Sequence, residues 1–384
     1  MTDPTCADDI VGNGPAPPDK KRGWPAIGIA ALLTGLAVPA AAQTPPAPRP
    51  DDAPAIRVGT QIFTDYTVTE QPTATDADGN EFTPNAFNVT RAYLNLTGNI
   101  SRLVAFRVTP DVVRETGPGS SVNGSLTFRL KYAYAQFNLD DWMPRGSFVR
   151  FGMQQTPWID FIDGVYRYRF QGPLFEDREG FLSSADVGAT ARYVLPGDYG
   201  DVHGGFYNGE NFNRIEPNDQ KALMVRGTVR PLPRHPGLRG LRVTGFYDHD
   251  AYLKDAERRR RIVALTYEHP YVNAGANLLE TSDRTRAANP QLEGRGFSVW
   301  ATPKTPKGWG WEGLLRVDRI TQEQASSARE SERDRTIAGI AYWFPRQGNV
   351  AAALLLDYER VNNNFYVPFR PDERRWALHT LISF

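Results

Sequence analysis

Arginine is the residue of this sequence whose positions most suggest chemistry. Six arginines stand on the polar side of segments in which apolar and polar residues alternate: Arg91, Arg107, Arg150, Arg192, Arg226 and Arg242. Two more, Arg167 and Arg169, lie in the long connecting segment 156–183. The planar guanidinium presents a fork of donors that matches carboxylate and phosphate. The eight residues are therefore candidates for reversible contact with anions.

Groups for covalent catalysis or metal binding form no recognisable motif. The five histidines are scattered and none has the spacing of a metal-ligand pair: His203, His235, His249, His269 and His379. Gly-x-Ser-x-Gly and P-loop patterns are also lacking. We therefore expect no enzyme activity, no metal and no cofactor. A lipase or protease whose catalytic residues come from distant strands remains an alternative, because a single sequence would not reveal it.

The N-terminal region has the order of features found in secretory signal peptides. Lys20, Lys21 and Arg22 precede a short apolar run, and Ala40-Ala41-Ala42 offers a small-residue cleavage site. A single anchoring helix is the alternative, but the apolar run is short and interrupted. The expected divisions are a signal peptide over 1–42, a Pro-rich linker over 43–55 and a folded unit over 56–384.

Charge and cysteine content exclude some partners and chemistries. The chain has 44 basic and 44 acidic residues. Residues 1–42 hold three of the basic and four of the acidic ones, so 41 and 40 remain beyond them. Such a balance does not favour a nucleic-acid partner. The only cysteine, Cys6, lies in the segment expected to be removed, which leaves no disulfide or thiol chemistry.

From Ile56 onward the dominant hydrophobic pattern has a period of two, as in strands with two differently solvated faces. Leu223, Val225 and Val229, for example, alternate with polar neighbours such as Arg226. About sixteen such segments are expected, each on the order of ten residues, which suits a tilted strand crossing a membrane. They lie near 56–66, 87–98, 102–110, 125–138, 146–155, 184–195, 201–209, 220–230, 240–248, 259–268, 271–281, 293–301, 310–320, 335–344, 348–360 and 373–384, and a bulge is expected in 125–138.

The connections between these segments alternate between short and long. The short ones include 98–101, 196–200, 268–271 and 345–348, and the long ones are 67–86, 111–124, 156–183, 210–219, 249–258, 282–292, 321–334 and 361–372. This layout, with short periplasmic turns and long extracellular loops, is typical of bacterial outer-membrane barrels. We therefore predict an all-β fold, a transmembrane antiparallel β-barrel of about sixteen strands. Phe384 shares the parity of Trp376 and Leu378, so it is expected to face lipid.

A soluble β-sandwich or propeller is the structural alternative. Its inward faces would pack a core in which arginine is rare, whereas here the polar face carries a charge in most segments. A water-filled lumen permits those charges. Barrels of about sixteen strands leave an aqueous channel. The expected location is therefore the outer membrane of a Gram-negative cell, in contact with lipid and lipopolysaccharide.

Several runs resemble the phosphate-selective porin O and P family. They are Phe128–Phe137, Arg150–Trp158, Tyr166–Phe170, Phe206–Asn211 and the pair Arg230-Pro231. The resemblance implies a sixteen-stranded porin, usually a homotrimer, with loops folded into the lumen and anions such as phosphate among its solutes. It also implies a lysine-rich constriction. Only seven lysines occur in the whole chain, and no lysine cluster matches that constriction.

The predicted function is passive diffusion of small hydrophilic solutes through the barrel. Segment 156–183, rich in aromatic and charged residues, is expected to fold inward and narrow the lumen; a cap over the mouth or a subunit contact is the alternative. The wall arginines would either attract anions or pair with acidic wall residues such as Asp186, Asp248, Asp318 and Asp357. The run Arg258–Arg261 would meet lipopolysaccharide phosphates, guide anions, or be a solvated strand end. A structural envelope barrel or adhesin is a further alternative.

Overall fold

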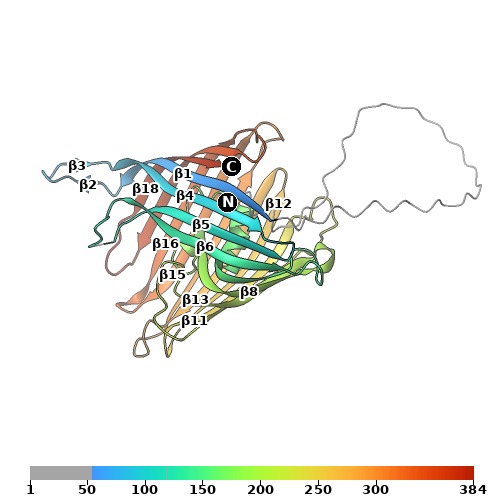
Figure 1. The fold of residues 1–384 in the computed structure, drawn as a ribbon. Helices are drawn as coiled ribbons and strands as arrows, with labels where there is room; N and C mark the ends of the chain where they lie inside the picture. Colours follow the sequence, from blue (N-terminus) through green and yellow to red (C-terminus); the bar gives the residue numbers. More distant parts are fainter. Residues whose placement is uncertain (1–53, 118) are drawn as a thin grey trace, which may run out of the picture.

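The computed structural model describes residues 54–117 and 119–384 of the chain. Within these residues sixteen antiparallel strands close into one barrel, which confirms the predicted fold class and strand number (Figure 1). None of the helices in the described residues is long and apolar enough to cross a membrane. The predicted signal peptide over 1–42, and the linker over 43–55 except its last two residues, lie outside the described residues.

The strands follow one another around the barrel in chain order, and each expected segment corresponds to one of them. The barrel strands are β1 (Ala55–Gln71), β4 (Asn85–Asn99), β5 (Val104–Arg114), β6 (Leu126–Asn138), β7 (Phe148–Gln155), β8 (Ala185–Leu195), β9 (Gly200–Tyr207), β10 (Ala222–Val229), β11 (Leu241–Leu253), β12 (Ala256–His269), β13 (Val272–Asp283), β14 (Leu292–Pro303), β15 (Trp311–Gln324), β16 (Ser327–Trp343), β17 (Ala351–Asn364) and β18 (Glu373–Ser383). The other elements of the described residues are a small hairpin of β2 (Ala74–Thr75) and β3 (Glu81–Phe82) and three helical segments. The helical segments are α2 (Pro157–Tyr166), α3 (Phe175–Arg178) and the single turn η1 (Pro196–Asp198).

Alternation along the strands separates an apolar outer face from a mixed inner face. In β10, Met224 and Arg226 are buried on the inside, whereas Val225 and Val229 are exposed on the outside. Successive strand residues point to opposite sides of the sheet, so a period of two places all residues of one parity on the same face. An apolar exterior suits lipid, and the closed barrel leaves no strand edge unpaired.

The barrel closes by pairing its first and last strands. The β1–β18 ladder runs from Gln61 opposite Ser383 to Gln71 opposite Arg374. Beyond it, the backbone N–H and C=O of Phe384 both bond with Thr60, at 3.0 and 2.7 Å. The Phe384 side chain is exposed on the outer face, as its parity predicted. The two ends of the sheet therefore form one continuous hydrogen-bonded seam.

Three connections that the sequence predicts as long loops are mostly strand. Residues 249–258 belong largely to β11 and β12, and residues 321–334 largely to β15 and β16, with turns of only two residues at 254–255 and 325–326. Residues 67–86 extend β1 and contain the β2–β3 hairpin. The backbone ladder continues past the apolar belt, where both faces are polar and the hydrophobic alternation disappears. The loop prediction was therefore wrong for these segments.

The bulge expected in segment 125–138 is present. The pairing of β5 with β6 shifts between Thr109, opposite Tyr132, and Pro110, opposite Leu130. Lys131 has no partner in this register. The extra residue lets Lys131 and Tyr132 both lie toward the lumen, where alternation alone would send one of them outward. Beyond the bulge, Phe137 is again exposed on the outer face.

Candidate functional site inside the barrel

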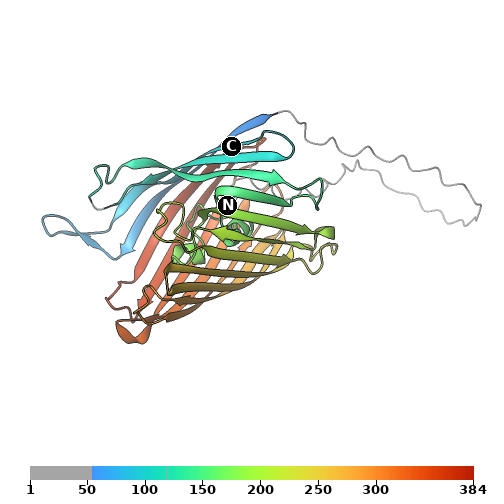
Figure 2. The same ribbon diagram turned by 60° about the horizontal axis from the view of Figure 1, so that its bottom comes forward.

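The segment that joins β7 to β8 lies inside the barrel. Figure 2 shows its helical part, in green, within the ring of strands, and α2 packs against β10, β12 and β13. The helix begins at Pro157, a residue suited to the first turn because it lacks an N–H. It ends before Arg167, whose φ of 68° is left-handed. The structure thus places segment 156–183 in the lumen, the placement that the sequence favoured over a cap.

One side of this segment packs an apolar core against the barrel wall. The ring of Trp158 lies 6.0 Å from that of Phe246 on β11, measured between ring centroids. Further along, the rings of Tyr166 and Trp300 on β14 are 5.1 Å apart. All four of these side chains are almost completely buried. Burial of such large aromatic side chains is among the strongest stabilising contributions available to a fold. Aromatic side chains therefore pack this side of the segment against the inner wall of the barrel.

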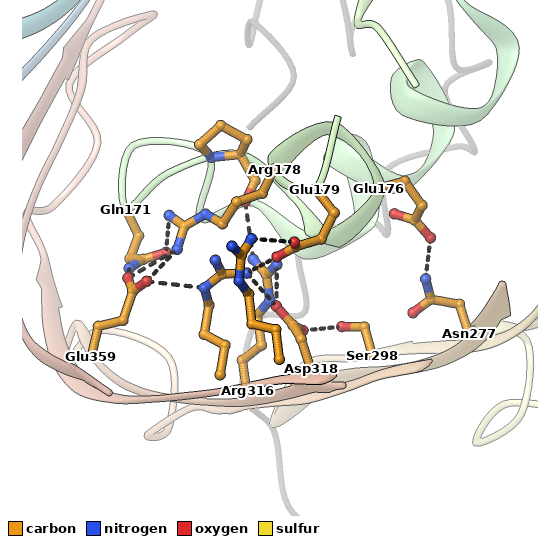
Figure 3. A network of polar contacts seen from close by, with 12 residues as sticks. Gln171, Glu176, Arg178, Glu179, Asn277, Ser298, Arg316, Asp318 and Glu359 are labelled. Atoms are coloured by element: carbon orange, nitrogen blue, oxygen red, sulfur yellow. Dashed lines mark hydrogen bonds and ion pairs between the residues drawn. The ribbon is translucent and has the colours of Figure 1, made fainter. Parts of the chain in front are cut away.

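The second half of the segment is held by buried ion pairs (Figure 3). Arg178 donates to both carboxylate oxygens of Glu359 on β17, at 2.8 and 2.9 Å. Glu179 accepts from Arg333 at 2.7 Å and from Arg335 at 2.6 Å, both on β16. Glu359 also accepts from Arg335, so the two glutamates belong to one network. A buried charge that lost its partner here would be strongly destabilising, so the network fixes the position of the segment.

Two further contacts extend the attachment to other strands (Figure 3). Arg316 on β15 donates to the backbone oxygen of Pro173 at 3.1 Å, while Asp318 balances its charge at 2.7 Å. Glu176 accepts a hydrogen bond from Asn277 on β13. Burial raises the pKa of the Glu176 carboxyl to about 7, because the loss of hydration outweighs its hydrogen bonds and the charge of Arg316.

The opposite face of α2 stays polar and partly accessible. Asp160, Phe161 and Asp163 are on this face, and none of them is fully buried. The guanidinium of Arg226 on β10 lies 4.9 Å from the centre of the Phe161 ring. Asp163 lies 3.8 Å from Arg169 of the same segment. This face of α2 therefore carries two carboxylates that are not fully buried.

The eight arginines singled out in the sequence all lie within the barrel, and most of them are ion-paired. Six have a carboxylate partner: Arg91 with Asp111 (2.7 Å), Arg167 with Glu312 (3.8 Å), Arg169 with Asp177 (2.7 Å), Arg192 with Asp201 (3.0 Å), Arg226 with Asp201, and Arg242 with Glu268. This arrangement corresponds to the paired-wall alternative. The structure does not unite the eight into one continuous ladder, because local carboxylates neutralise most of them.

Arg107 and Arg150 have different surroundings. Arg107 donates to Asn95 at 2.7 Å and lies 4.5 Å from the centre of the Tyr132 ring. Arg150 is fully buried, donates to Gln136 at 2.7 Å and stacks on Phe148 at 4.1 Å. Among the described residues no carboxylate pairs with Arg150, and its Nη2 has no hydrogen-bond acceptor. Arg150 therefore adds positive charge to the wall without contacting solvent.

The acidic partners were only partly predicted. Of the four acidic wall residues proposed from the sequence, Asp318 pairs with arginine, whereas Asp186 accepts from the backbone of Val187 and Gly209. Asp357 lies 3.1 Å from His379. Asp248 is buried, and its Oδ1 has no partner among the described residues. Partner choice depends on which strands are neighbours and on their register, which the sequence alone did not give.

The arginine run over 258–261 alternates between the two faces of β12. Arg258 and Arg260 lie inside and pair with Asp250 and Asp283. Arg259 and Arg261 lie outside, where they pair with Glu257 and Glu280. The run is therefore not a single basic patch, and only its outward half is exposed toward the surroundings of the barrel.

Sequence reasoning missed several residues of the inner wall. Lys131 is 2% exposed and donates to the hydroxyl of Tyr93 at 3.2 Å. Asp111 is fully buried and binds both Arg91 and Arg129. The bulge expected in segment 125–138 was the available signal for Lys131, because a bulge changes the parity of the residues beside it. Within the described part of the chain, no group of three or more His, Cys, Asp or Glu is arranged to hold a metal ion.

Comparison with known proteins identifies the fold of this chain but not its family. No protein-family model and no curated protein sequence matches the chain. Several solved structures are similar in fold. An anion-selective porin from Comamonas acidovorans has a TM-score of 0.59 at 12% identity, covering 86% of this chain and all of that one.

Two other structures give the same picture. OmpT, an outer membrane protein of Vibrio cholerae in its trimer form, has a TM-score of 0.56 at 13% identity, over 87% of this chain and 100% of that one. The outer membrane channel DcaP of Acinetobacter baumannii has a TM-score of 0.54 at 12% identity, over 86% and 97%. At this identity the similarity shows a shared barrel. The resemblance to the phosphate-selective porin O and P family stays a prediction.

Proposed function

We propose that this chain is an outer-membrane porin through which small hydrophilic solutes diffuse passively. The barrel has sixteen strands, the size at which a lumen remains after the wall is formed. Segment 156–183 fills one side of that lumen and leaves the other side polar. Porins do their work by offering a wet path whose width and charge decide what crosses. No covalent step is part of the proposal.

The observation that carries the proposal is the division of segment 156–183 into two faces. Its apolar face is packed on β11 and β14, and its ion pairs hold it to β15, β16 and β17. Its polar face presents Asp160 and Asp163, neither of which is fully buried. A segment that is rigidly attached on one side and hydrated on the other is suited to narrow a channel without closing it.

The proposed selectivity is a modest preference for anions. The neighbouring strands β5, β6 and β7 carry Arg107, Lys131 and Arg150, and no ion pair to a described residue holds Arg150 or Lys131. The remaining arginines are mostly neutralised by nearby carboxylates, so their field is weak at a distance. Phosphate is one anion that would pass, but the support for phosphate in particular is the family resemblance alone.

The proposed setting is a homotrimer in the outer membrane, with lipid and lipopolysaccharide as its surroundings. The trimer form of Vibrio cholerae OmpT, whose barrel is similar, supports the assembly. Chemical crosslinking of the protein in native membranes would test it, with a threefold band expected on denaturing gels. Bands of the monomer alone would contradict a trimer while leaving the porin proposal intact.

Planar-bilayer recording of the purified protein tests the porin proposal. We expect discrete conductance steps and, in an asymmetric KCl gradient, a reversal potential on the anion-selective side. Absence of steps would contradict the channel, and a reversal potential favouring cations would contradict the selectivity. Refolding should be verified first by heat-modifiable migration on a gel, so that a silent preparation is informative.

Two substitutions test which arginines determine the anion selectivity. Arg167 is 34% exposed at the end of α2, so Arg167→Ala should lower the anion-to-cation permeability ratio by about a factor of two. Arg150→Ala removes a fully buried charge and should lower the ratio less. Arg261→Ala is the matched control, because Arg261 lies on the outer face and should have no effect. Equal effects of all three substitutions would contradict a path through the lumen.

A further inference from the structure

A cluster of cations lies on the inner wall of the barrel, at the bulge of β6. Asp111 binds Arg91 at 2.7 Å and Arg129 at 3.0 Å. Lys131 lies beside them, and its one hydrogen bond within the described residues is to the hydroxyl of Tyr93. Two cations thus share one carboxylate, and a third lies next to them without an ion pair to a described residue. The cluster therefore carries an excess of positive charge, and its members lie on strands that line the lumen.

The nearby carboxylates of segment 156–183 pair with another cation, Arg169. Arg169 comes close enough to act electrostatically on Lys131, but it brings its own partners, Asp177 at 2.7 Å and Asp163 at 3.8 Å. Among the described residues no carboxylate forms an ion pair with Lys131. Two of the three ammonium protons of Lys131 therefore have no acceptor among the described residues, since the hydrogen bond to Tyr93 uses one. A bound anion would satisfy them.

Aromatic rings surround the same ammonium. The Nζ atom of Lys131 is 5.1 Å from the ring centre of Tyr93, 5.8 Å from that of Tyr132 and 5.4 Å from that of Phe212. The guanidinium of Arg129 lies 4.8 Å from the same Phe212 ring. These distances are within the range of cation–π attraction. We call Tyr93, Arg129, Lys131, Tyr132 and Phe212 the Lys131 cage.

Phe212 differs from the other members of the cage because a loop supplies it. It belongs to residues 208–221, which join β9 to β10, and it reaches across to β6. Hydrogen bonds to residues outside the cage hold this loop in place. The Gly209 N–H donates to Asp186 at 2.9 Å, and Asn218 donates to the backbone of Tyr252 at 3.0 Å. Phe212 thus places an uncharged ring over two cations, which leaves the excess charge uncompensated.

We infer that the Lys131 cage is a binding site for small aromatic carboxylates, and that Phe212 occupies the position of their ring. The ring of such a solute would contact Arg129 and Lys131 as Phe212 does, while its carboxylate would satisfy the ammonium. Phosphate could use the charge but not the ring faces of Tyr93 and Tyr132. The inference rests on the proposed function, because it names a solute class for the same lumen.

Current block by benzoate tests the inference in planar bilayers with the full-length protein. The comparison solute is cyclohexanecarboxylate, which has the same charge and a similar size but no π face. We expect benzoate to half-block the current at a concentration about threefold to fivefold lower than cyclohexanecarboxylate. Inorganic phosphate should compete only at concentrations well above those of benzoate. Equal block by the two carboxylates would overturn the aromatic part of the inference.

Two substitutions distinguish a bound ring from a general charge effect. Lys131→Gln should raise the half-blocking concentration of benzoate about tenfold, because a charge-assisted contact is lost. Phe212→Ala should lower it, because the competing ring is removed. Lys304→Gln and Phe365→Ala are the matched controls; Lys304 lies on another part of the barrel, and Phe365 packs on Arg329 in a different loop. Weaker benzoate block in Phe212→Ala would overturn the assignment of Phe212 as a stand-in for solute.

Failure of the inference can be told apart from failure of the porin proposal. Conductance steps without selective benzoate block would overturn the cage as a site and leave the porin intact. Without conductance steps, the porin proposal fails, and calorimetric titration of the folded protein in detergent with benzoate decides the inference instead. Binding that Lys131→Gln abolishes would support the site there, and no binding would overturn it.

Discussion

Substitution of Glu359 by glutamine should loosen segment 156–183 inside the barrel. Glu359 is almost completely buried on β17 and accepts hydrogen bonds from Arg178 and Gln171 of the segment. It also accepts from Arg335 and Arg375 of the wall. Glutamine keeps the shape of the side chain but removes its charge. Four donors, three of them cationic, would then face an uncharged amide.

The expected loss of docking free energy depends on how many of these contacts hold the segment. Breaking a buried ion pair by removing one partner costs about 3–5 kcal/mol, since it leaves an uncompensated charge. Two of the four donors to Glu359 come from the segment. The second anchor, Glu179 with Arg333 and Arg335, stays in place. We therefore expect docking to weaken by about 2 kcal/mol, which raises the undocked population roughly thirtyfold.

Hydrogen exchange and single-channel noise would measure this change. Amides of α2 and α3 should exchange about thirtyfold faster in Glu359→Gln if exchange follows undocking. The open-channel current should show added noise from the same motion. Glu268→Gln is the matched control, because Glu268 pairs with Arg242 and both belong to the wall. Protection of the wall strands should be the same in both variants.

One result would refute the reasoning directly. If Glu359→Gln left both the exchange rates of α2 and α3 and the current noise at the values of the unsubstituted protein, the ion pairs would not be what holds the segment. The packing of Trp158 and Tyr166 against the wall would then be sufficient alone. Loss of protection across the whole barrel would instead indicate that the variant is misfolded, and the double variant Glu359→Gln, Arg178→Gln would then show whether matched removal restores docking.

Three further predictions concern the same segment. Burial raises the pKa of Glu176 from 4.5 to about 7, so the docked segment binds an extra proton between these pH values, and docking should weaken by about 3 kcal/mol as the pH rises through that window. Glu176→Gln should abolish this pH dependence in exchange measurements between pH 5 and pH 8. A profile that is unchanged in the variant would contradict the prediction. Asp160→Asn combined with Asp163→Asn removes acidic groups from the accessible face of α2, so the anion-to-cation permeability ratio should at least double; a fall in that ratio would show that the face is not on the solute path. Trp158→Ala leaves a cavity against β11 and should destabilise docking by about 3–5 kcal/mol, with faster exchange in α2; a change below 1 kcal/mol would mean that the apolar contact is dispensable.

Local periodicity was enough to predict the barrel, because each strand carries its own signal. Val225 and Val229 alternate with Met224 and Arg226 whatever the neighbouring strands are, and the structure places the two sets on opposite faces. The same reasoning failed where both faces are polar. Residues 249–258 have no apolar parity, yet the backbone ladder of β11 and β12 runs through them to a two-residue turn. Strand structure there depends on pairing and not on the side chains.

The identity of the inner partners could not be predicted, because it depends on pairs that are far apart in the chain. Arg178 and Glu359 are separated by 181 residues, and Arg335 and Glu179 by 156. The sequence placed arginines on the inner parity correctly, but any of them could have met any acidic residue of a neighbouring strand. Register decides between the candidates: Asp201 on β9 receives Arg192 from one neighbouring strand and Arg226 from the other.

This distinction bears on selectivity. The sequence left an anion-attracting row of arginines and a wall of paired charges as alternatives, and the structure pairs most of these arginines with carboxylates. Where an excess persists, it comes from the bulge of β6, which turns Lys131 inward without supplying a carboxylate. If a single irregularity in one strand sets the net field of the lumen, Lys131→Gln should shift the reversal potential toward cations more than Arg226→Gln does. Arg226 is matched by Asp201, so its removal exposes a negative charge that Arg192 still holds. The opposite ranking would show that pairing within the wall does not screen the arginines from passing ions.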